Sequence, residues 1–214
     1  MSKDKIGALT RVAVGIKHEY HGIALDVLNR LNSGDASAWA GRFAEVVQQG
    51  LPSSEVYLRK ISGDVTIPAT TGARTIAQAK KTFPGYIDSD FANWGLNVPS
   101  PSTPDTSVEV HEQVKDGTFA TIFGSLGKNL DDLCFTQGQN ISFVEVHPEL
   151  LHPEGYGTFF LFKVNGEYFV AGVDRRSGGR LQAYVYRFSF DDVWYAEYRS
   201  RFVFPQLGTS DTQS

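Results

Sequence analysis

Cysteine is almost absent from this chain of 214 residues, which contains one, Cys134. One cysteine cannot form a disulfide within the chain, so a small secreted fold held together by disulfides is excluded. No apolar run reaches the length of about 18 residues that a membrane-spanning helix needs, and the first residues lack the pattern of a signal peptide. We therefore expect a soluble cytoplasmic protein without membrane contact. The apolar neighbours of Cys134 favour a buried thiol over a nucleophile.

An excess of positive charge is also missing, because the net charge of the chain is −4. The segment 83–155 holds eleven acidic residues and two lysines, whereas the rest of the chain is basic on balance. Nucleic-acid backbones bind clustered lysines and arginines, so nucleic acid is disfavoured as a partner. The acidic segment either packs against the basic remainder, within one chain or between two copies, or lies on solvated surfaces.

Three apolar runs near the carboxyl end predict antiparallel strands. The runs TFFLFKV and EYFVAGV flank Asn165-Gly166, whose residues accept the positive φ angles of a type I′ hairpin turn. With this turn, Phe162 faces Phe169 across the hairpin. Both faces of the hairpin are apolar, which predicts a central position in a sheet that is covered on both sides. The runs LQAYVYRF and RFVF predict a third and a fourth strand.

The chain before these strands is predicted to be mainly helical. Apolar residues recur with helical spacing over 6–31 and 36–49, which predicts a hairpin of two helices. Residues 55–67 predict a short β-hairpin, and the small polar residues 69–72 predict a domain boundary. Glycines and capping residues delimit short helices over 74–82, 108–115, 118–126 and 136–147, the last with Gln139 completing a capping box.

Helices in the first part of a chain and antiparallel strands in the last part predict an α+β fold. The predicted N-terminal region, 1–70, contains the helical hairpin and the short β-hairpin. The predicted C-terminal domain, 73–207, contains short helices followed by an antiparallel β-meander, and residues 208–214 are expected to form a disordered tail.

The loop from Asp174 to Arg180 is the strongest candidate for a binding site. Its predicted binding residues are Arg175, Arg176, Gly178, Gly179 and Arg180. Three guanidinium groups at the end of a rigid hairpin can hold an anion, and glycines leave backbone N–H groups accessible. The expected partner is a protein with an acidic surface or a second copy of this chain. The alternative is a solvated turn in which Asp174 pairs with one of the arginines.

The sequence HPELLHPE, residues 147–154, is the candidate for catalytic chemistry. His147, His152 and Glu154 are of the residue types that bind zinc or another divalent ion. Pro148 interrupts the spacing between the two histidines, so they do not share one helix face. A helix end and a turn that lead into the strands explain the segment equally well, and we expect no bound metal and no cofactor.

Three stretches, FPGYIDSDFANWG, DGTFATIFGSLG and GTFFLFKVNGEYFVAGV, resemble an uncharacterised family of bacterial proteins. The resemblance covers residues 73–207 and implies no activity. No nucleophile, base and orienting group can be placed together in the sequence. We therefore expect a non-catalytic binding or assembly protein and keep an enzyme as an alternative. The alternatives are a metal-dependent hydrolase that uses HPELLHPE, and an accessory protein that binds single-stranded nucleic acid through Arg175, Arg176 and Arg180, with Tyr184 or Tyr186 stacking on bases.

Overall fold

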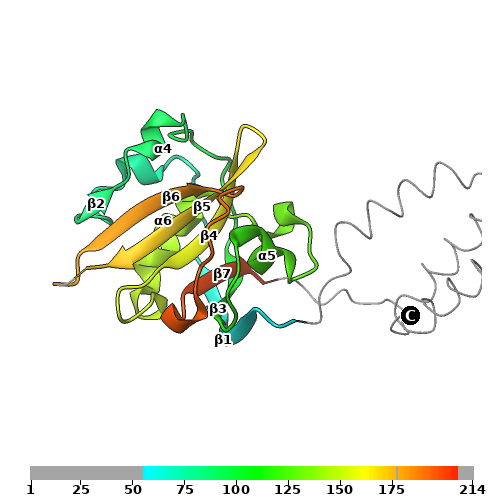
Figure 1. The fold of residues 1–214 in the computed structure, drawn as a ribbon. Coiled ribbons are helices and arrows are strands. Elements are labelled where there is room, and N and C mark those ends of the chain that lie inside the picture. The colour runs from blue at the N-terminus through cyan, green and yellow to red at the C-terminus, as the bar shows by residue number, and fades with distance from the viewer. Residues whose placement is uncertain (1–54, 177, 207–214) are drawn as a thin grey trace, which may run out of the picture. The chain divides into compact units, whose positions relative to one another are not determined.

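The computed structural model describes residues 55–176 and 178–206, which form one sheet with helices on both faces (Figure 1). The strands are β1 (Leu58–Ile67), β2 (Tyr86–Ile87), β3 (Thr106–Gln113), β4 (Thr158–Val164), β5 (Glu167–Arg175), β6 (Leu181–Arg187) and β7 (Arg201–Pro205). The α-helices of the described residues are α4 (Asp90–Asn93), α5 (Phe119–Gly124) and α6 (Gln137–Val146). Short 3-10 turns are η2 (Ile76–Gln78), η3 (Leu130–Leu133), η4 (Pro148–Leu150) and η5 (Ala196–Tyr198).

The seven strands lie in the order β1-β3-β7-β4-β5-β6-β2. The pairs β2–β6 and β4–β7 are parallel, and the other neighbours are antiparallel. The sheet is therefore mixed. Strand β1 lies before the predicted boundary at 69–72 and pairs with β3, which lies after it.

The hairpin of β4 and β5 has the predicted register. Phe162 lies opposite Phe169, and Val164 lies opposite Glu167 at the turn. Both turn residues have positive φ, 51° at Asn165 and 85° at Gly166, as a type I′ turn requires. The hairpin is central in the sheet, between β7 and β6.

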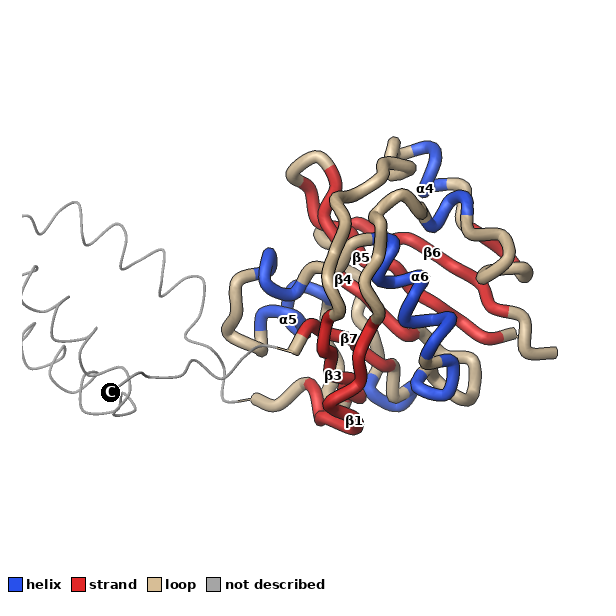
Figure 2. Tube along the Cα trace, turned by 180° about the vertical axis from the view of Figure 1, so that it is seen from behind, coloured by secondary structure: helices blue, strands red, loops and turns tan. Residues whose placement is uncertain are grey.

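Apolar side chains are buried on both faces of this hairpin. One face carries Phe160 and Phe162 and packs against α6 and the segment around α4. Figure 2, which shows the sheet from behind, places α6 across this face. The other face carries Phe159 and Leu161 and packs against α5. Covering layers on both faces explain why neither set of hairpin side chains is polar.

The predicted α+β arrangement, with a terminal antiparallel meander, is wrong, because the described part of the chain is mostly a mixed sheet. Residues 108–115 were expected to be helical, but 106–113 form β3. Their alternation of valine with polar residues suits a strand with one buried face. Residues 55–67 were expected to form a hairpin, but 58–67 form the single strand β1, whose register shifts between Lys60 and Ser62 and again before Val65. The residues predicted to form a turn, 62–64, thus lie in β-bulges within one continuous strand.

Several local predictions are confirmed. Helix α5 lies within the predicted range 118–126, and α6 begins with the predicted capping box of Thr136 and Gln139. Strand β7 contains the predicted fourth run. Of the helix predicted over 74–82, only the short turn η2 is present. The helices predicted over 6–31 and 36–49 and the tail at 208–214 lie outside the described residues.

Candidate functional site

The predicted arginine loop connects β5 to β6 at one end of the sheet. The turn is closed by two backbone hydrogen bonds: the N–H of Arg176 donates to Arg180 O (3.0 Å), and that of Gly179 donates to Arg176 O (2.9 Å). Gly178 and Gly179 have φ angles of 91° and 79°, which side chains rarely permit. The glycines are therefore needed for the turn itself, which is a sufficient reason for their presence.

The three arginines of this loop have different surroundings. Arg175 is half-buried, and its Nη2 donates to the carbonyl oxygen of Pro148 at 2.8 Å, so it ties β5 to the HPELLHPE segment. Arg176 and Arg180 are exposed. In the part of the chain that the structure describes, no carboxylate forms an ion pair with either side chain. Two of the three predicted arginines, Arg176 and Arg180, are therefore available to bind a partner.

Arg176 is held in place by two side chains of β6. Its Nε donates to Gln182 Oε1 at 2.7 Å, and its Nη2 donates to the hydroxyl oxygen of Tyr184 at 3.1 Å. The Tyr184 hydroxyl in turn donates to Gln182 Oε1 at 2.8 Å. This closed network fixes the guanidinium group over the sheet before any ligand arrives.

An aromatic ring extends the same surface across to β2. Tyr86 pairs with Gln182 in the parallel ladder, and its ring lies 5.4 Å from that of Tyr184. The Tyr86 side chain is 44% exposed. Together these residues form what we call the Tyr–Arg surface: Tyr86, Arg176, Arg180, Gln182 and Tyr184. Helix α5 lies over the other end of the sheet, away from the β5–β6 turn (Figure 1).

The sequence contained a signal for part of this surface. In the predicted strand LQAYVYRF, alternation puts Gln182, Tyr184 and Tyr186 on one face and the buried Ala183 and Val185 on the other. The prediction from the sequence includes Tyr184 and Tyr186 as stacking residues but not Gln182. Tyr86 had no local signal, since β2 has two residues and pairs in parallel with a strand far along the chain.

Asp174 introduces a negative charge beside Arg176. It lies opposite Gln182 on the neighbouring strand. Burial raises the pKa of the Asp174 carboxyl above its usual value, and Arg176 partly offsets this. Among the described residues, no donor forms a hydrogen bond to this carboxyl. A half-buried carboxylate without a donor costs stability at neutral pH.

Asp174→Asn is therefore expected to raise the free energy of unfolding at neutral pH. The folded-state pKa lies above the usual 3.8, so the folded protein binds this proton more tightly than the unfolded chain does. The penalty is absent below pH 3.8 and appears as the pH rises through the folded-state pKa. Urea denaturation of the variant and the wild type should show a gain at neutral pH that shrinks on acidification. A gain that is independent of pH would contradict this explanation.

The two histidines of HPELLHPE are engaged separately. The Nε2–H of His147 donates to the carbonyl oxygen of Thr66 on β1 at 2.9 Å. His152 is buried, and its Nδ1 accepts the backbone N–H of Glu154 at 3.2 Å. Burial, followed by the charge of Arg201, lowers the pKa of His152. No group of three or more His, Cys, Asp or Glu side chains that could hold a metal ion occurs between residues 55 and 206, with 177 left aside.

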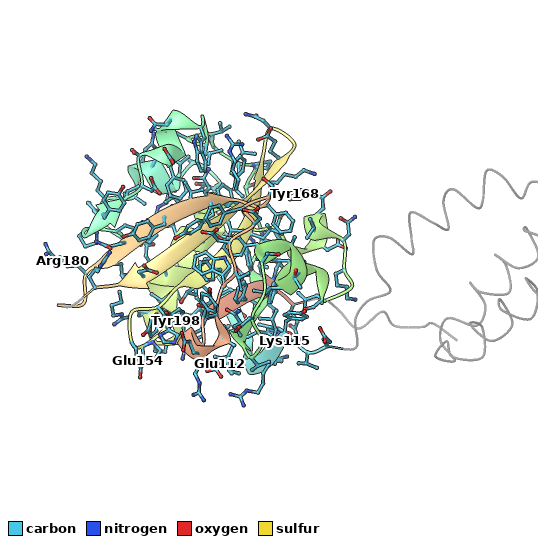
Figure 3. All side chains as sticks on the ribbon, viewed as in Figure 1. Glu112, Lys115, Glu154, Tyr168, Arg180 and Tyr198 are labelled. Carbon is cyan, nitrogen blue, oxygen red and sulfur yellow. The ribbon has the colours of Figure 1, made fainter. Side chains whose placement is uncertain are left out.

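The HPELLHPE segment and Gly155, which follows it, both contact Arg175 at the start of the arginine loop. Besides the bond from Arg175 to Pro148, Gly155 lies so close to the Arg175 carbonyl oxygen that a Cβ there would collide with it. Figure 3 shows Glu154 and Arg180 at separate places on the outside of the molecule. The structure thus joins the two predicted sites through the side chain of Arg175, which donates to Pro148 O, and does not pair Glu154 with any of the three arginines in the described residues.

A cavity of about 460 Å³ lies elsewhere, between the loop 98–103 and the start of α6. Several polar side chains that line it are already engaged: Thr136 and Gln139 in the capping box, and Gln137 with the carbonyl oxygen of Leu96. Cys134 also lines it, but burial raises the pKa of this thiol to about 12, and its Sγ–H donates to Leu130 O. The cavity therefore offers no reactive thiolate.

Comparison with known proteins returned no family model, no curated protein and no solved structure that matches the chain. Within the described residues, no helix has the length and apolar character needed to cross a membrane. The Tyr–Arg surface is therefore the main guide to function. It combines exposed cations, an exposed aromatic ring and a fixed hydrogen-bond network on paired strands.

Proposed function

We propose that this chain is a non-catalytic binding or assembly protein whose Tyr–Arg surface contacts an acidic partner. The observation that carries the proposal is the position of Arg176. Its guanidinium group is exposed and has no carboxylate partner among the described residues, yet Gln182 and Tyr184 hold it in one orientation. A pre-oriented guanidinium loses less conformational entropy when it binds, and its planar fork suits carboxylates.

The composition of the surface also supports binding. Tyrosine and arginine dominate the residues that contribute most to protein–protein affinity. Tyr86 and Tyr184 supply apolar area, while Arg176 and Arg180 supply charge, all from two adjoining strands and the turn between β5 and β6.

The test uses a fluorescein-labelled oligoglutamate peptide as the acidic probe. Arg176→Ser with Arg180→Ser is expected to weaken binding by about tenfold or more, because two exposed charges are removed. The binding of the wild type should weaken as salt rises. Folding should be unchanged, since exposed charges contribute little to stability.

A matched control removes the same charge elsewhere. Lys80 and Lys128 are exposed, and Lys80→Ser with Lys128→Ser is expected to leave peptide binding within about twofold of the wild type. Equal losses in the two double variants would mean that the peptide senses only net charge. Unchanged binding in the arginine variant would place the contact surface elsewhere.

Single-stranded nucleic acid is a second candidate, favoured by the exposed ring of Tyr86 near Arg176. Aromatic rings beside cations bind successive bases of a single strand by stacking. The carboxylate of Asp174 does not distinguish the two candidates, because it lies next to Arg176 and repels phosphates and carboxylates alike. Labelled oligothymidine in the same assay separates the two functions: binding tighter than that of oligoglutamate, and lost in Tyr86→Ala, would favour the nucleic acid.

A further inference from the structure

A second exposed surface, of opposite charge, lies on the connection between β6 and β7. We call it the acidic segment, residues 190–195. Its apolar members Phe190, Val193 and Tyr195 are 38%, 46% and 52% exposed. Asp191 and Asp192 are exposed too, and neither forms an ion pair with a residue of the described ranges.

The acidic segment is anchored to the protein through Trp194. The backbone N–H of Trp194 donates to Gly117 O at 2.9 Å, and the N–H of Gly117 donates to Trp194 O at 3.1 Å. The Trp194 ring packs against Phe159, with 4.6 Å between ring centroids. The exposed side chains on either side of Trp194 are thus presented by a fixed backbone.

Both surfaces lie on the same face of the sheet. Tyr186 alternates with Gln182 and Tyr184 along β6, and its ring packs against Phe190 and Trp194 at 5.8 and 5.2 Å. The Tyr–Arg surface is at the start of β6, and the acidic segment follows its end. One face therefore carries a basic aromatic end and an acidic aromatic end.

The two ends do not pair with each other in the part of the chain that the structure describes. No ion pair there joins Arg176 or Arg180 to Asp191 or Asp192. Each end therefore keeps exposed charges with which a partner of opposite charge can pair.

We propose that this partner is a second copy of the chain, bound about a two-fold axis so that each basic end meets the other copy's acidic end. A two-fold interface requires a self-complementary surface, in which residue i contacts j and j contacts i. The face meets this requirement, because it carries two positive charges at one end, Arg176 and Arg180, and two negative charges at the other, Asp191 and Asp192. Aromatic side chains at both ends supply apolar area for the contact. This inference rests on the proposed function and names its partner.

The experiment exchanges the charges and then mixes the variants. Arg176→Glu with Arg180→Glu makes both contacts of the homodimer repulsive, and so does Asp191→Lys with Asp192→Lys. By sedimentation velocity at low salt, the wild type is expected to dimerise reversibly. Each variant alone should show a dimer dissociation constant at least about 100-fold higher. An equimolar mixture should dimerise within about tenfold of the wild type, because both contacts are attractive again.

A fold check accompanies each variant, by circular dichroism and thermal denaturation. If a reversed variant does not fold, the serine variants Arg176→Ser with Arg180→Ser and Asp191→Ser with Asp192→Ser replace the pair. Their mixture keeps one of the two contacts and should dimerise more tightly than either variant alone. Failure of mixing to restore dimers, with both variants folded, overturns the two-fold contact.

The outcomes for the wild type separate this inference from the proposed function. A wild type that stays monomeric at the highest soluble concentration, yet binds oligoglutamate through Arg176 and Arg180, overturns the dimer and leaves the acidic-partner function standing. A wild type that dimerises while the reversed variants dimerise equally well overturns the contact described here. If the arginine variants keep both the dimer and the binding of the peptide, the dimer contact and the acidic-partner function are both overturned.

Discussion

Phe162→Ala is expected to lower the free energy of unfolding by about 3–5 kcal/mol. The Phe162 side chain is 1% exposed, and its ring lies 5.8 Å from that of Phe169 across the hairpin. It also stacks on Phe91 of α4 at 6.4 Å. Truncation therefore opens a cavity between the central strands and the segment that covers them. Urea denaturation at neutral pH measures the loss.

Phe190→Ala provides the matched control for this change. It deletes the same atoms from a side chain that is 38% exposed, so no closed cavity forms. We expect a loss below about 1 kcal/mol, measured at a protein concentration low enough to exclude association. Similar losses in the two variants would mean that Phe162 is not enclosed, and the register of the β4–β5 hairpin would then need revision.

The features that could be predicted from the sequence are those set by neighbouring residues. An Asn-Gly pair between two apolar runs determined the β4–β5 register, and Thr136 with Gln139 determined the start of α6. In each case the hydrogen bonds or φ angles involved are local, so residue identities are sufficient. The strands and helices with which these elements pack lie far away in the sequence, so neighbouring residues do not identify them.

The strands that were missed depend on distant partners. Strand β3 has an alternating pattern that was outweighed by the glycine punctuation after it, and β1 keeps its pairing with β3 by bulging. Strand β2 is a strand only because Tyr86 and Ile87 meet β6. Short segments of this kind carry too little intrinsic preference to be assigned without the tertiary structure.

The candidate site shows the same division. The cluster of arginines and glycines was visible in the sequence, and Tyr184 was a candidate for stacking, but Gln182 was missed. What separates Arg175 from Arg176 was not visible, because it depends on the carbonyl group of Pro148, which the fold brings to β5. Sequence reasoning therefore found the loop but not which guanidinium groups are available.

Gly155→Ala tests the contact between the arginine loop and the residue that follows the HPELLHPE segment, and it is expected to cost about 2–5 kcal/mol in the free energy of unfolding. Two effects add. Gly155 has a φ of 85°, which costs an alanine about 1–2 kcal/mol. The new Cβ would also collide with the carbonyl oxygen of Arg175, and such overpacking typically costs about 1–3 kcal/mol.

Gly166→Ala isolates the second effect, because Gly166 has the same φ of 85° and nothing within 4 Å of a new Cβ. This control should lose only the backbone cost of about 1–2 kcal/mol. The excess loss in Gly155→Ala, measured by urea denaturation, reports the contact with β5. Because relief of the collision moves the backbone next to Arg176, Gly155→Ala should also weaken oligoglutamate binding, whereas Gly166→Ala should not. Equal stabilities and equal peptide binding in the two variants would show that the segment and the loop are independent.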